Sequence, residues 1–170
     1  MRTSFLRSAS RSLALSALVL AMGQSAAWAG GDHWPFKRIT GVWTARVNIT
    51  NCLPGTTTPG PIVFASFDAL NVYAADGTFL DTNNTDPTTS SAHFGYWRHI
   101  RGNKYEFAQK FFLFDTVIAG TPASYRIVRH EVIVDRTGMS FTSGGYAQTF
   151  GADGTLLATG CSTSSAVRFD

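Results

Sequence analysis

The sequence predicts an all-β protein, a single antiparallel up-and-down β-barrel of about eight strands. Three observations predict this fold. Runs of β-branched and aromatic residues alternate with polar residues along most of the chain, which is the period of a half-buried strand. Turn signals separate these runs at near-regular spacing, and the connections after residue 93 are so short that only antiparallel neighbours are allowed. No segment combines a helical period with helix caps.

The predicted strands follow one another from residue 41 onward. The first, residues 41–52, has apolar side chains at every second position. An Asp76-Gly77 pair between two apolar runs predicts a tight hairpin. The proline-rich segment 53–60 and the polar segment 82–91 predict loops. The remaining predicted strands are residues 61–75, 78–81, 93–101, 104–117, 123–135, 139–150 and 155–169.

Several of these strands are apolar on both faces, which leaves open which face lines the interior. In the strand at 104–117, Phe107 lies on one face, and Phe112 and Phe114 lie on the other. A strand of a small barrel is apolar outward only where something covers it. The cover would be the aromatic lead-in at residues 30–40 or a second subunit.

Residues 1–29 have the three parts of a secretory signal peptide. A segment with three arginines precedes the apolar stretch 13–22, and an Ala-Trp-Ala cleavage site ends at Ala29. The apolar stretch is shorter than the roughly 20 residues of a membrane span, so we expect no span. We predict cleavage after Ala29, export to the periplasm or the medium, and one barrel domain over residues 41–170.

The charge of the chain is concentrated in this predicted signal peptide. The formal net charge is +3, from 14 Lys and Arg against 11 Asp and Glu. Residues 1–29 hold three of the arginines and no acidic residue, so the remaining charges cancel. The sequence therefore predicts no nucleic-acid partner, although the whole-chain isoelectric point near 9.1 would favour one.

The two cysteines favour a closed sheet over a sandwich of two sheets. Cys52 ends the first predicted strand and Cys161 lies in the last. A pair of cysteines in an exported chain predicts a disulfide, and a disulfide needs Cα atoms within about 7 Å. The first and last strands meet only if the sheet closes on itself.

The four histidines are His33, His93, His99 and His130. No His-x-His or His-Glu-x-x-His pattern occurs, so we expect no metal site. His93 and His99 share one strand face, and the simplest interpretation is that rim histidines bind backbone carbonyls. His130 is a candidate acid or base if its strand face lines a cavity.

Two features interrupt the apolar strands. Asp68 lies in the middle of one, where a carboxylate is paired, protonated or exposed to a polar interior. Pairing with Arg46 or Arg126 is one interpretation of Asp68, and catalysis is the other. Gly144-Gly145 predicts a bulge or a bend at a barrel corner.

A set of short motifs spread over the chain resembles known barrel proteins. Gly41-x-Trp43 is similar to the start of lipocalins and other calycins, in which the tryptophan fills the closed end beneath a ligand cavity. The wider set resembles a group of small exported bacterial proteins with a lipocalin-like barrel, which implies that fold and leaves the activity open. The other motifs are Cys52, Phe67-x-x-Leu70, Asp76-Gly77-Thr78, Gly95-x-Trp97, Phe111-Phe112-x-Phe114-Asp115, Asp153-Gly154 and Cys161.

Three functions are compatible with this sequence. The first is binding of a small apolar or aromatic molecule in the interior, because an eight-stranded barrel encloses room for one small ligand. The second is a cofactor-free isomerase, cyclase or lyase in a barrel like that of allene oxide cyclase. The third is a structural protein that forms homo-oligomers through outward aromatics. Candidate ligand-lining residues are Phe64, Phe67, Tyr73, Trp97, Phe107, Phe112 and Phe114, and candidate catalytic residues are Asp68, His130, His99 and Tyr96.

Overall fold

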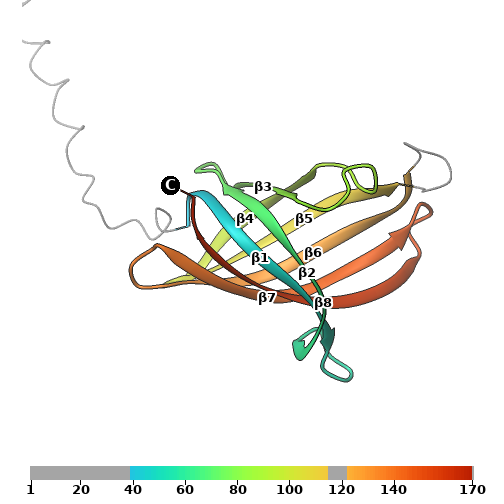
Figure 1. Cartoon of the computed structure of the whole chain (residues 1–170), viewed down its shortest axis with the longest axis horizontal. Coiled ribbons are helices and arrows are strands. Elements are labelled where there is room, and N and C mark those ends of the chain that lie inside the picture. Colours follow the sequence, from blue (N-terminus) through green and yellow to red (C-terminus); the bar gives the residue numbers. More distant parts are fainter. Residues whose placement is uncertain (1–38, 115–121, 170) are drawn as a thin grey trace, which may run out of the picture. The chain divides into compact units, whose positions relative to one another are not determined.

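The computed structural model describes residues 39–114 and 122–169 (Figure 1). These residues form eight strands, and no helix occurs among them. The signal peptide, most of the lead-in, His33 and Asp115 lie outside the described residues. The strands are β1 (Gly41–Cys52), β2 (Pro59–Tyr73), β3 (Thr78–Asn83), β4 (His93–Arg101), β5 (Lys104–Phe114), β6 (Pro122–Val134), β7 (Ser140–Gly151) and β8 (Leu156–Arg168).

The eight strands close into an antiparallel ring in chain order. The closing pair is β1 with β8, in register from Trp43 opposite Arg168 to Thr50 opposite Cys161. This confirms the predicted all-β fold and the adjacency of the first and last strands. The predicted loop after β1 is shorter than expected, because β2 already begins at Pro59, opposite Cys52. A proline is tolerated there because the first residue of a strand need not donate a ladder hydrogen bond.

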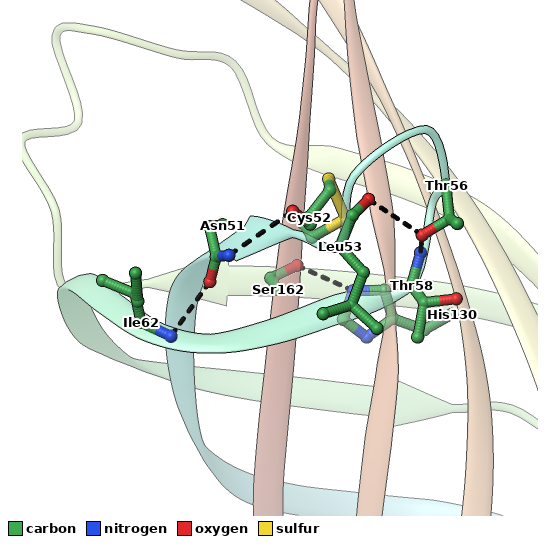
Figure 2. Close-up of a disulfide and its surroundings, with 9 residues drawn as sticks. Asn51, Cys52, Leu53, Thr56, Thr58, Ile62, His130 and Ser162 are labelled. Atoms are coloured by element: carbon green, nitrogen blue, oxygen red, sulfur yellow. Dashed lines mark hydrogen bonds between the residues drawn. A yellow bond between two sulfur atoms is a disulfide. The ribbon is translucent and has the colours of Figure 1, made fainter.

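The predicted disulfide joins Cys52 to Cys161, with Cα atoms 5.2 Å apart (Figure 2). Cys161 is buried although its neighbour Ser162 faces the interior, so the disulfide lies on the outer side of the barrel wall. The adjoining β1–β2 hairpin is held by the Asn51 side chain, whose Oδ1 accepts a hydrogen bond from the Ile62 amide at 2.9 Å. The disulfide therefore joins the first and last strands of the ring covalently.

One half of the barrel interior is filled by a large apolar cluster. Trp43 is fully buried, and its indole nitrogen donates to the Ile39 carbonyl at 2.8 Å. Burial of a large apolar side chain stabilises a fold by about 1.5–3 kcal/mol. The packed half can therefore stabilise the barrel while the other half stays unfilled. The cluster comprises Ile39, Trp43, Ala45, Ala69, Tyr73, Phe79, Trp97, Tyr105, Phe107, Val132, Val134, Phe141 and Ala166.

The structure also determines which strand faces point inward. In β5, Tyr105, Phe107, Gln109 and Phe111 are buried, whereas Phe112 is 45% exposed on the other face. The short Asp76-Gly77 hairpin is confirmed, with Gly77 at a φ of 91°.

Of the two alternatives predicted for Gly144-Gly145, a bulge or a bend, the bulge is wrong, because β7 keeps regular register with both neighbours there. Gly145 instead allows close contact, since a Cβ would lie 1.9 Å from the Arg129 carbonyl oxygen and 2.7 Å from His130 Cδ2.

Candidate functional site

The other half of the barrel contains a cavity of about 300 Å³. Its walls are the inward side chains of the strands, and Thr85, Thr89 and Ser90 of the β3–β4 connection also line it. Its apolar lining residues are Val47, Ile49, Phe67, Phe79, Phe107, Phe111, Leu113, Val128 and Ala147. The polar side chains gather in two groups among them, one around Asp81 and one around His130.

The first polar group is centred on the carboxylate of Asp81. Asp81 Oδ1 accepts a hydrogen bond from Asn71 Nδ2 at 2.7 Å. Asp81 Oδ2 lies 2.7 Å from His93 Nδ1 and accepts a second hydrogen bond from Gln109 Nε2 at 3.3 Å. In the neutral tautomer that donates Nδ1–H to Asp81, Nε2 of His93 is an acceptor. Within residues 39–114 and 122–169, no hydrogen-bond partner engages Nε2.

Three more side chains, those of Phe111, Arg126 and Thr149, continue from His93 around the wall. The imidazole of His93 stacks on the ring of Phe111, with centroids 3.8 Å apart and planes at 13°. The guanidinium of Arg126 lies over the same ring, 5.9 Å from its centroid. Arg126 Nε donates to Thr149 Oγ1 at 3.0 Å. An acid, an imidazole, an aromatic ring and a cation thus follow one another on strands β3 to β6.

The second polar group surrounds His130, which is buried. Its Nδ1 lies 2.9 Å from Ser143 Oγ. Its Nε2 lies 2.8 Å from Ser162 Oγ (Figure 2). Ser143 Oγ lies 2.7 Å from Ser164 Oγ, which extends the chain of hydroxyls. Burial lowers the pKa of His130 from 6.5 to about 4, so the imidazole is neutral at neutral pH. Among the described residues no carboxylate contacts its ring nitrogens, so this group resembles a satisfied buried network more than a catalytic triad.

The structure places two of the predicted ligand-lining residues at the cavity. Phe67 and Phe107 line it, whereas Tyr73 and Trp97 lie in the apolar cluster. Burial, followed by the charge of Asp81, raises the pKa of Tyr73 well above its usual 10.0. Phe64 is 67% exposed, and neither Phe112 nor Phe114 lines the cavity. These three face outward because the strand alternation has the opposite parity at their positions.

Of the four predicted catalytic residues, only His130 lines the cavity. Asp68 lies on the outer surface, paired with Arg46 at 2.9 Å, which is the structural interpretation of that residue. Tyr96 is 56% exposed on the outside of β4. His99 Nε2 lies 2.9 Å from the carbonyl of Gly102, the contact expected of a rim histidine. These three residues do not share the cavity with His130.

The sequence analysis did not identify Asp81 or Arg126 as site residues. Its interpretation of His93 as a rim histidine bound to a backbone carbonyl is wrong, because His93 is buried and contacts Asp81. Asp81 lies at the end of a short predicted strand next to a polar loop, where an aspartate is an ordinary turn residue. A signal was present, because His93 and Arg126 each occupy the same strand face as an apolar neighbour, Trp97 and Val128 respectively. Only cross-strand register brings Asp81 opposite His93 and Phe111 opposite Arg126.

Comparison with known proteins adds no assignment to this geometry. No family model matches the sequence, and no curated protein matches it either. In the part of the chain that the structure describes, no three His, Cys, Asp or Glu side chains are placed to hold a metal ion. No helix among the same residues is long and apolar enough to cross a membrane.

Proposed function

We propose that this protein is an exported, lipocalin-like barrel that binds one small, largely apolar or aromatic molecule in its cavity. The observation that carries this proposal is the cavity itself, about 300 Å³ in volume and lined mainly by aliphatic and aromatic side chains. Pockets for small molecules range from about 300 to 1,000 Å³ and place a few polar groups among apolar walls. The disulfide agrees with an exported protein, because such bridges persist in oxidising compartments.

A neutral fluorescent probe tests this proposal directly. N-phenyl-1-naphthylamine brightens when it leaves water for an apolar site, and we expect saturable binding at one site per chain. Ala147→Trp, which extends an indole into the cavity, should abolish binding. Phe64→Ser on the outer surface is the control and should leave binding unchanged. If the probe binds no wild-type protein, or if only Phe64→Ser removes binding, the cavity is not the binding site. If the probe binds in the cavity as expected, native mass spectrometry of protein purified from its own host would identify the natural ligand.

The Asp81–His93 pair favours a second candidate, a cofactor-free isomerase, cyclase or lyase. A carboxylate that orients an imidazole beside an apolar cavity is the arrangement of a general base. Elimination of 5-nitrobenzisoxazole measures such a base without knowledge of the substrate. The base removes the ring C–H proton, the N–O bond breaks, and a cyanophenolate forms. We expect His93→Gln to reduce this rate by about 100-fold, the usual contribution of a general base. A rate that responds to His130→Gln and not to His93→Gln would contradict this assignment.

The outward aromatics favour a third candidate, a protein that associates through its surface. Phe94, Tyr96 and Phe112 are exposed on the neighbouring strands β4 and β5. Exposed apolar patches often mark an interface. Light scattering tests this candidate, and a monomer at high protein concentration would exclude self-association.

A further inference from the structure

Arg126 is a cation of the cavity lining that uses only one of its nitrogens for hydrogen bonds to the residues that the structure describes. A guanidinium has five N–H donors in a planar fork. Arg126 uses Nε for Thr149 Oγ1. In residues 39–114 and 122–169, no acceptor engages its terminal nitrogens, and no carboxylate forms an ion pair with it. Arg46 on the outer surface differs, because it is paired with Asp68.

The environment of Arg126 makes an unpaired cation unfavourable. The residue is half-buried and lies over the ring of Phe111. Burial lowers the pKa of its guanidinium below the ordinary value for arginine. A buried charge without a partner is costly, and an anion that enters with a ligand removes much of that cost.

Asp81, the acid of the same cavity, is not the missing partner. Its two oxygens already accept hydrogen bonds from Asn71 and Gln109 and contact His93 Nδ1. Strands β4 and β5 separate its strand from that of Arg126. Among residues 39–114 and 122–169, the fork of Arg126 therefore keeps donors that a bound ligand could use.

We propose that Arg126 binds the carboxylate of the ligand, so that the cavity takes an amphipathic monocarboxylic acid. The planar fork matches the two oxygens of a carboxylate. A single arginine balances one negative charge, which favours a carboxylate over a doubly charged phosphate. The apolar part of the acid then contacts Val47, Phe67 and Val128 deeper in the lining. This inference rests on the proposed binding function and specifies its ligand class.

A matched pair of ligands separates the charge of the ligand from its apolar part. Decanoate and decanamide have the same chain, and each is used to displace N-phenyl-1-naphthylamine at pH 8. We expect wild-type protein to prefer decanoate. Arg126→Gln should weaken decanoate binding by about 10- to 100-fold, the usual effect of losing a charge-assisted hydrogen-bond pair. The same substitution should change decanamide binding by less than about twofold.

Two further variants complete the test. Arg46→Gln removes an arginine from the outer surface and should affect neither ligand. Arg126→Lys keeps the charge without the fork, so it should bind decanoate with intermediate affinity. It replaces Arg126→Gln as the test variant if Arg126→Gln does not fold. Equal affinity of wild-type protein for both ligands, or equal weakening of both by Arg126→Gln, would overturn the inference while the binding function stands. If the probe itself does not bind wild-type protein, the binding function fails and this inference fails with it.

Discussion

Asp81 and His93 are cross-strand partners in β3 and β4, and their side chains meet in the cavity wall with Oδ2 and Nδ1 2.7 Å apart. Both side chains are buried, in contrast to the exposed Arg46–Asp68 pair on the outer surface. The hydrogen bond is stronger in the enclosed interior than it would be in water. It also orients the imidazole of His93 next to the ring of Phe111. The carboxylate is therefore important for both stability and the proposed site.

Replacement of Asp81 by alanine should destabilise the barrel much more than the same change at Asp68. Asp81→Ala leaves the buried donors of Asn71 and Gln109 without an acceptor, which costs about 2–4 kcal/mol of unfolding free energy. Asp68→Ala breaks an exposed ion pair, which contributes at most about 1 kcal/mol. Urea denaturation of both variants measures the difference. Equal losses would show that the Asp81 network contributes no more than a surface pair.

The stability of the protein should fall between about pH 6.5 and pH 4 because of His130. The folded state holds the pKa of this imidazole at about 4, below the usual 6.5, so the unfolded chain binds the extra proton first. The contribution is complete above about pH 6.5, decreases as the pH falls, and is lost below about pH 4. Its size is about 3 kcal/mol from the shift in pKa.

The variant His130→Gln identifies this pH effect. Unfolding free energies measured from pH 8 to pH 4 should have a smaller slope in His130→Gln than in wild-type protein. A slope unchanged by His130→Gln would mean that another group titrates in this range.

Loss of the disulfide should lower stability without changing the fold class. The bridge joins residues separated by 109 positions, so its removal enlarges the unfolded ensemble. We expect the double variant Cys52→Ser, Cys161→Ser to lose about 2–4 kcal/mol of unfolding free energy. Far-ultraviolet circular dichroism should still report a β-structure, because ladder pairing closes β1 onto β8 independently. Reduced wild-type protein should match the double variant, and a stable reduced protein would contradict this prediction.

Of two adjacent glycines, one should lose stability when it is replaced by alanine and the other should not. A Cβ at Gly145 would lie 1.9 Å from the Arg129 carbonyl oxygen, so Gly145→Ala must displace β6 and the imidazole of His130. Overpacking of this kind costs about 1–3 kcal/mol. A Cβ at Gly144 would have its nearest neighbour at 3.5 Å, an ordinary contact, so Gly144→Ala should stay within about 0.5 kcal/mol of wild type. Thermal unfolding compares the two, and similar melting temperatures would exclude close strand contact at Gly145.

The sequence by itself was sufficient for the class of fold, the antiparallel order of the strands and the bridge between Cys52 and Cys161. These features follow from local signals, because alternation, short turns and paired cysteines each act over a few residues or through covalent geometry. It also led to His130, whose strand face carries Arg126 and Val128.

The tertiary structure alone decided which parity faces inward and which polar residues meet. Phe64, Phe112 and Phe114 are as apolar as Phe67 and Phe107, so composition cannot distinguish the outer wall from the cavity. Asp81, His93, Phe111 and Arg126 lie far apart in the chain and are brought together by register across four strands. Register depends on the whole closed sheet, because a shift of one residue in any strand moves all its side chains to the other face.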